Sequence, residues 1–332
     1  MSDPQEQNFQ PPTPPSPKPE TPPERPTRLR TPAIVLFVLG IIVLLGGIAN
    51  FVPGGVATGG AVAFLGVLVF ALSFIPLPQV EGAEPPMSPV EKVAGIFYEP
   101  TTVFRNLRAH PRWLTAFVII CVMSVAYSFA FTQRLTPERI VNFMTDKLAE
   151  TGFVPADKIE EARARQLEQA RNPVQRVGTA VKSVVGIFCV FSFLAGLFLL
   201  GILAFGGRIN FWQVFAALLY ASLPVTIIQK AISLVILYVK SPDDIHPVLG
   251  AETLVQDNLG ILFSPSVHPV FFVAGTAIGV LSFYRLWLTA KGLQYAGQKV
   301  SSTAAWGVTI TVWVLSLILG MIFAALFSSF IS

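Results

Sequence analysis

The chain has 332 residues, of which 53% are hydrophobic and only 13% charged, and its mean hydropathy is +0.63. A chain this apolar and this poor in charge is not an ordinary soluble domain, and the composition indicates an integral membrane protein. The net charge of +4 does not indicate nucleic-acid binding, because the basic residues flank apolar runs instead of forming a patch.

Residues 1–32 are polar and crowded with proline, as in the run Pro11-Pro-Thr-Pro-Pro-Ser-Pro17. This composition cannot bury a core and favours extended polyproline II structure or disorder. We therefore expect a disordered cytoplasmic tail. Its P-x-x-P patterns leave two roles open, a solvated spacer or a ligand for the aromatic groove of a protein partner.

Residues 33–77 contain two apolar runs separated by the turn Pro53-Gly-Gly55, which predicts a transmembrane hairpin. Glycines allow close backbone approach, so we expect the two helices to pack on each other. The spacing of Gly55 and Gly59 leaves a second use open, the formation of homo-oligomers through the hairpin. The glycines concerned are Gly40, Gly46, Gly47, Gly55, Gly59, Gly60 and Gly66.

Residues 78–111 form a polar connector with one short amphipathic segment, Pro89 to Phe97. Val90, Val93 and Phe97 recur there at helical spacing, and arginines follow at Arg105 and Arg108. The pattern predicts a helix on the membrane surface, where cytoplasmic proteins can reach it.

Residues 112–332 contain the remaining apolar runs. Each is long enough to cross about 30 Å of hydrocarbon. The predicted spans are residues 113–131, 183–205, 211–239, 269–290 and 306–329. A charged loop at 132–182 separates the first two and is expected to hold two helices, residues 137–150 and 156–170. The predicted fold class is therefore all-α, a polytopic membrane bundle of seven transmembrane helices in which a hairpin precedes a five-helix domain.

The distribution of arginine and lysine predicts an orientation in the cell membrane, because cytoplasmic loops carry an excess of both. Basic residues precede the first and third spans, occupy the turn after the fourth and follow the sixth. This places the N-terminus in the cytoplasm and the C-terminus outside it. The charged loop at 132–182 then lies outside, although its bases slightly outnumber its acids, because long segments translocate with weak charge bias.

The sequence contains no recognisable catalytic or cofactor motif. Neither G-x-S-x-G, nor H-E-x-x-H, nor a phosphate-binding glycine loop occurs. The three histidines are scattered, and Cys121 and Cys189 lie inside apolar runs, so neither residue type indicates a metal site or a disulfide. We expect a protein that is not an enzyme, with no cofactor.

The predicted fifth span, Phe211 to Val239, carries a proline and a lysine within apolar sequence. Pro224 predicts a kink. At 1.5 Å per residue Lys230 lies about 29 Å from Phe211, near the far interface. Polar residues share one face of this helix and point toward the bundle interior: Ser222, Thr226, Gln229, Lys230 and Ser233.

Two interpretations of this polar stripe remain open. The first is a helix-packing face whose lysine meets loop carboxylates or carbonyls. The second is the lining of a passive channel or small-solute transporter, although no predicted span holds an aspartate or glutamate. In the sixth span Arg285 lies about 8 Å from the cytoplasmic end, so Arg285 and Trp287 are expected to anchor the helix at the interface.

Three stretches resemble the Yip1 family of five-helix membrane proteins, in its bacterial branch. They are Gly95 to Trp113 before the third span, Tyr220-Ala-Ser-Leu-Pro224 in the fifth, and Leu286-Trp-Leu-Thr-Ala-Lys-Gly-Leu293 after the sixth. The resemblance covers about residues 88–332 and implies the fold and a membrane location, with no catalytic residue. The glycine-rich hairpin and the proline-rich tail are additions to it. The function we expect is membrane organisation or a protein-interaction scaffold, with the bilayer and cytoplasmic proteins as partners.

Overall fold

The computed structural model describes residues 26–80, 84–150, 152, 154–248, 250, 254–255 and 257–326. Most of the predicted tail, residues 1–25, lies outside this part of the chain. The described part is helical and contains no strand beyond two isolated bridges, which confirms the all-α fold class.

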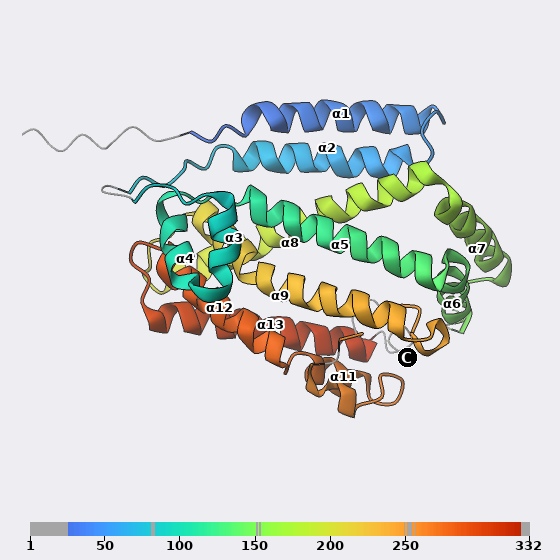
Figure 1. Cartoon of the computed structure of the whole chain (residues 1–332). Coiled ribbons are helices and arrows are strands. Elements are labelled where there is room, and N and C mark those ends of the chain that lie inside the picture. Colours follow the sequence, from blue (N-terminus) through green and yellow to red (C-terminus); the bar gives the residue numbers. More distant parts are fainter. Residues whose placement is uncertain are drawn as a thin grey trace, which may run out of the picture.

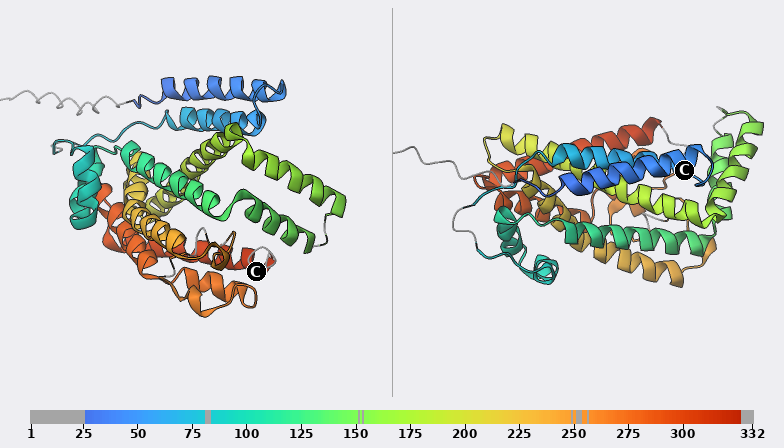
Figure 2. Two further views of the ribbon diagram at one scale, coloured as in Figure 1. Left: turned by 45° about the vertical axis from the view of Figure 1, so that its right-hand side comes forward. Right: turned by 90° about the horizontal axis from the view of Figure 1, so that it is seen from above.

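Six long helices run roughly alongside one another (Figure 1; Figure 2). Each is long and apolar enough to cross a membrane. They are α1 (Arg30–Ile48), α2 (Gly55–Leu72), α5 (Leu114–Leu135), α8 (Pro173–Ala204), α9 (Phe211–Val239) and α13 (Ser302–Leu326). The shorter helices are α3 (Pro89–Tyr98), α4 (Pro100–Ala109), α6 (Pro137–Glu150), α7 (Ala156–Arg171), α11 (Pro269–Thr276), α12 (Val280–Ala296) and the 3-10 turns η1 (Pro242–Asp244) and η2 (Leu259–Leu262).

Helix α9 is the centre of the bundle. Every residue from Phe211 to Ala221 is buried, and α5, α8 and α12 all pack on it. An aromatic cluster surrounds its first turns, where Trp212 and Phe215 contact Trp113 at the N-terminal cap of α5 and Phe215 also contacts Phe188 of α8. Since large aromatic rings bury the most apolar area per residue, this cluster stabilises the junction of the three helices.

The bundle has two distinct ends (Figure 1). One, the connector end, holds α3, α4 and the turns α8–α9 and α12–α13. The other, the opposite end, holds α6, α7, the α1–α2 turn and the loop after α9. Hydrogen bonds support this grouping, because Asn210 at the start of α9 donates to the carbonyl of Pro76, and Arg208 pairs with Lys299.

The glycines of the hairpin face each other across α1 and α2. A Cβ atom added to Gly59 would overlap the backbone of Leu44, and one added to Gly40 would overlap Ala63. The small face that includes Gly55 and Gly59 is therefore buried inside the hairpin, as the packing interpretation predicts. The outer face of α1 is largely exposed, with only Ala33 and Gly40 buried.

The predicted sixth span, Pro269 to Ala290, is not one continuous helix. The chain ends α11 at Thr276 and starts α12 at Val280, so among the described residues six continuous helices have spanning length. Gly279 is extended and pairs with Asn258, and its missing Cβ makes room for that strand-like contact. The loop before α11 thus supplies hydrogen-bond partners that an uninterrupted helix would not need.

Candidate functional site

The polar stripe predicted on α9 lies on the side of the helix away from α12. Ala217 faces α12, where it lies beside Gly292. Thirteen residues later, at about 100° per residue, Lys230 is rotated by about 220° from that contact. Ser233 is buried, with 3% of its surface exposed. The other four members are half-buried: Ser222, Thr226, Gln229 and Lys230.

Lys230 packs on α5. Its Nζ atom lies 4.5 Å from the centroid of the Tyr127 ring, within the range of a cation–π interaction. Because α9 begins at Phe211, as predicted, Lys230 lies about 29 Å along it. Tyr127 belongs to a small apolar cluster with Phe131, Leu135, Leu237 and Ile245 at the opposite end. The lysine thus contacts a packed helix pair, which favours the packing interpretation of the stripe.

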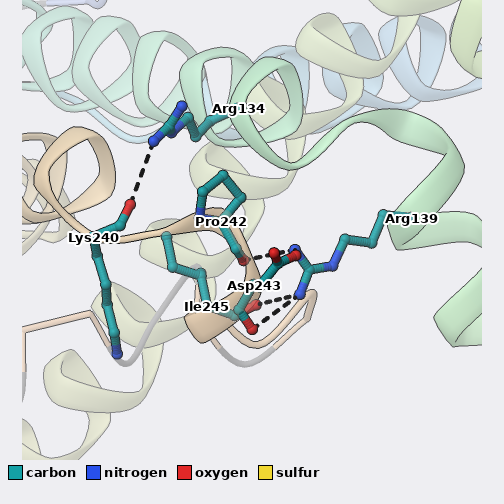
Figure 3. Close-up of polar contacts among 6 residues, drawn as sticks. All are labelled: Arg134, Arg139, Lys240, Pro242, Asp243 and Ile245. Atoms are coloured by element: carbon teal, nitrogen blue, oxygen red, sulfur yellow. Dashed lines mark hydrogen bonds and ion pairs between the residues drawn. The ribbon is translucent and has the colours of Figure 1, made fainter.

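Two arginines that the sequence analysis did not single out hold the C-terminal end of α9 (Figure 3). Arg134 of α5 donates to the carbonyls of Leu237 and Lys240, each over 3.4 Å. Arg139 of α6 donates to the Pro242 carbonyl over 2.6 Å and to the Asp243 carboxylate over 3.2 Å. The last carbonyls of a helix lack partners within it, so Arg134 caps α9, and Arg139 holds the loop that follows it. No local signal could reveal pairs about a hundred residues apart.

At the connector end, side chains at the start of α9 hold the connector by its backbone. Trp212 donates to the carbonyl of Ile75 over 3.0 Å, and Gln213 donates to that of Arg108 over 2.6 Å. Asn106 of α4 accepts from the Met87 amide and donates to the Pro85 carbonyl. Helices α3 and α4 are therefore fixed on the bundle as a rigid unit, which we name the connector platform (residues 84–109).

The outer face of the platform is apolar. Val90 and Tyr98 of α3 are 77% and 70% exposed, and Phe97 is also exposed. The inner face consists of Lys92, Gly95 and Ile96, all buried, with Val93 half-buried. Helix α3 starts with a capping box between Ser88 and Glu91, and those hydrogen bonds lower the pKa of the Glu91 carboxyl. The exposed apolar face suits either the membrane surface or a protein.

The predicted interface anchors lie on α12, and their place at the membrane interface stays a prediction. Helix α12 continues past Ala290 to Ala296, so Arg285 lies about 16 Å from the C-terminal end of the helix. The side chain of Arg285 is exposed, and Trp287, 37% exposed, stacks on Tyr284. Pro224 lies buried inside a continuous α9, and its kink stays a prediction.

The break before α12 brings a carboxylate to the N-terminal end of this helix. Asp257 accepts a hydrogen bond from the Leu281 amide through its side chain, over 2.7 Å, and one from the Val280 amide through its carbonyl. Both amides belong to the first turn of α12, where no intrahelical acceptor exists. Asp257 is thus an N-terminal cap. The sequence analysis did not predict the break between α11 and α12, so it could not predict that this loop aspartate caps a helix.

Two of the three stretches singled out in the sequence meet at one place, beside the part of α9 that precedes the third. A Cβ placed on Gly292 of α12 would lie 3.1 Å from the ring of Phe104 of α4 and 3.3 Å from the Cβ of Ala217 of α9, so the glycine lets both helices pack closely. Helices α4, α9 and α12 all pack on one another there. Within the described ranges no group of three or more His, Cys, Asp or Glu residues lies close enough to hold a metal ion.

These features define an all-helical integral membrane protein with a packed core and a surface platform at one end. The model of the Yip1 domain matches residues 94–324, and the chain belongs to the Yip1 family. The match begins within α3 and ends within α13, so the hairpin of α1 and α2 lies outside it. Comparisons with curated proteins and with solved structures found no match.

Proposed function

We propose that the protein is a non-enzymatic membrane scaffold that presents the connector platform to cytoplasmic proteins. The observation that carries the proposal is the combination of a rigid inner face and an exposed apolar outer face on α3. Val90, Phe97 and Tyr98 are exposed although the residues between them anchor the helix. Scattered apolar side chains are common on surfaces, but a contiguous patch on a fixed support indicates a contact surface.

The polar stripe supports the same proposal by its packing role. Its lysine contacts Tyr127, Arg134 caps α9, and Arg139 holds the loop that follows α9. Groups that are used to hold helices together are not available to bind a substrate. The described end of the tail lies at the connector end, since Thr27 donates to the carbonyl of Ser73 there. Tail and platform can therefore engage the same partner.

The experiment is site-specific photocrosslinking in the native membrane. A photoreactive residue replaces Tyr98 on the outer face of α3, and the matched control replaces exposed Glu160 on α7. We expect a discrete protein adduct from position 98 that is absent from position 160. Adducts with lipid alone at position 98 would show that the patch rests on the bilayer, contrary to the proposal.

A second candidate function, a passive channel or small-solute transporter, is favoured by the broken helix. Many transporters use broken helices whose half-helix ends form binding sites, and here α12 starts at a break where Asp257 caps its N-terminus. Liposomes containing the protein would then show solute flux that Lys230→Ala abolishes. Cysteines placed from Ser222 to Ser233 would also react with aqueous reagents, whereas a dry packing face stays unlabelled.

A further inference from the structure

A large cavity lies at the opposite end of the bundle, away from the platform and the α9 stripe. Four helices surround it in a ring, because α5 packs on α6, α6 on α7, α7 on α8 and α8 on α5. Helix α8 leans away from α5 toward the hairpin, where Gly178 meets Thr58 of α2. Figure 2 shows α6 and α7 projecting beyond the ends of α5 and α8. The cavity volume is about 630 Å³, within the usual range of ligand sites.

Most residues of the lining are polar, with an apolar part on α5. On α5 it begins with Val125 and Phe129 and ends with Thr132 and Gln133. On α8 it is polar and includes Ser183, Lys182, Arg176 and Gln175, and α7 adds Gln166 and Gln169. Val125 and Phe129 lie nearer the middle of α5 than Thr132 and Gln133 do. A ligand that fits this lining has a polar head and an apolar tail that lies along α5.

The charged residues of the lining leave an excess of positive charge. Three of them face the cavity, Glu138, Arg176 and Lys182. Glu138 is engaged by Arg171, which donates two hydrogen bonds to one of its oxygens over 3.1 and 3.0 Å. Arg176 donates through Nε to the Ala170 carbonyl over 2.7 Å, which fixes the guanidinium at the rim. The two cations therefore favour an anionic head group.

The cavity is continuous with surfaces that face lipid. Lys182 is the last charged residue before the apolar part of α8, and Gly186, Val190 and Phe193 follow on the same face. Open space surrounds a Cβ placed on Gly186, and Val190 is 57% exposed. On α5, Phe129 and Val122 are 55% and 59% exposed. An acyl chain that leaves the cavity can lie against these two apolar rows.

We propose that this cavity binds an anionic membrane phospholipid, with its phosphate at Arg176 and Lys182 and its acyl chains between α5 and α8. Basic pockets between transmembrane helices are a recurrent site for acidic lipid head groups. The glutamine and hydroxyl side chains of the lining can bond the remaining polar atoms of the head group. The proposal goes beyond the scaffold function and does not depend on it.

The test measures lipid retention by native mass spectrometry of the full chain released from nanodiscs that contain phosphatidylglycerol and phosphatidylcholine. The variant is Arg176→Gln with Lys182→Gln, both exposed side chains whose loss leaves the core intact. The control is Lys158→Gln with Arg165→Gln on α7, which removes the same charge outside the cavity. We expect phosphatidylglycerol retention to fall about a hundredfold in the variant alone, since the variant removes two cations and each charged hydrogen bond contributes about an order of magnitude.

A second variant tests the acyl-chain part without changing charge. Gly186→Leu places a side chain in the open space beside Lys182 and should also lower phosphatidylglycerol retention. Equal retention in the charge variant and its control would overturn the proposal. So would equal retention of phosphatidylcholine by the native chain, or displacement of the lipid by soluble glycerol phosphate at matching concentration, because the head group would then suffice.

Discussion

Lys92 is a lysine buried by its neighbours, with only 1% of its surface exposed. Its Nζ donates to the carbonyl of His110 over 3.3 Å. Burial, with a further contribution from Arg112, lowers its pKa from 10.5 to about 8. A shift of this size corresponds to a penalty of about 3 kcal/mol on the charged form, relative to a lysine in water. The connector platform therefore contains a buried lysine whose charged form is destabilised by its surroundings.

We predict that the stability of the native chain, relative to Lys92→Met, rises between pH 8 and pH 10. In this window the unfolded chain binds a proton at Lys92 and the folded chain does not, so raising the pH favours folding. Below pH 8 the penalty is complete and constant. Melting temperatures of both proteins across this range measure the effect, with Lys158→Met as the control for loss of an exposed lysine. Parallel pH profiles for native chain and variant would contradict the prediction.

The connector shows that the sequence did not predict which residues of α3 are buried. The spacing of Val90, Val93 and Phe97 predicts an apolar face turned toward the membrane surface, and Val90 and Phe97 are exposed, but the burial of Lys92 on the other side of α3 was not predicted. Helix α3 buries this face because it packs on α4 there and because the His110 carbonyl accepts a hydrogen bond from Lys92. Periodicity identifies a helix but cannot show which side a neighbouring helix covers.

At the scale of elements, the sequence predicted helices well where their ends carry local signals. Helix α6 has the predicted bounds, and α9 begins and ends where expected, starting with a capping box of Asn210 and Gln213. The break between α11 and α12 was missed, because it depends on Gly279 pairing with Asn258. Because the residues on both sides of the break are mostly apolar, the whole segment has the composition of one continuous span.

The packing of the hairpin can be tested with two adjacent glycines, Gly59 and Gly60, because only one of them lies against the backbone of the other helix. We predict that Gly59→Ala separates α1 from α2, whereas Gly60→Ala does not. A Cβ on Gly59 overlaps the backbone of Leu44, while one on Gly60 comes no closer than 4.0 Å to the Leu44 side chain. Both changes raise helix propensity equally, so propensity cannot explain a difference.

Spin labels at two exposed positions, Val38 of α1 and Val67 of α2, report the separation of the helices. Pulsed electron spin resonance should give a longer or broader distance distribution for Gly59→Ala and an unchanged one for Gly60→Ala. The same distribution in both variants would mean that close backbone contact does not hold the hairpin together.

For the whole molecule, ion pairing differs between the two ends of the bundle. All the ion pairs found among the described residues lie at the opposite end, in α6, α7 and the loop after α9, including Arg163 with Asp146 and Arg171 with Glu138. At the connector end the bases, such as Arg105, Arg208 and Lys299, outnumber the acids and enter none of those pairs. In the charged loop at 132–182, most of the basic residues therefore form ion pairs with acidic residues, which reduces the excess of bases that opposed an outside location.

This asymmetry favours the orientation with the connector platform in the cytoplasm, since unmatched lysine and arginine in short segments keep a membrane end inside. We predict that a membrane-impermeant maleimide labels Glu168→Cys on α7 in intact cells and labels Glu99→Cys, between α3 and α4, only after permeabilisation. Both side chains are exposed glutamates, so the pair differs in its end of the bundle and not in local environment. The native cysteines, Cys121 and Cys189, lie within membrane helices, and the unmodified chain measures their background. Labelling of position 99 in intact cells would place the platform outside, and the proposed cytoplasmic partners would then be excluded together with the orientation.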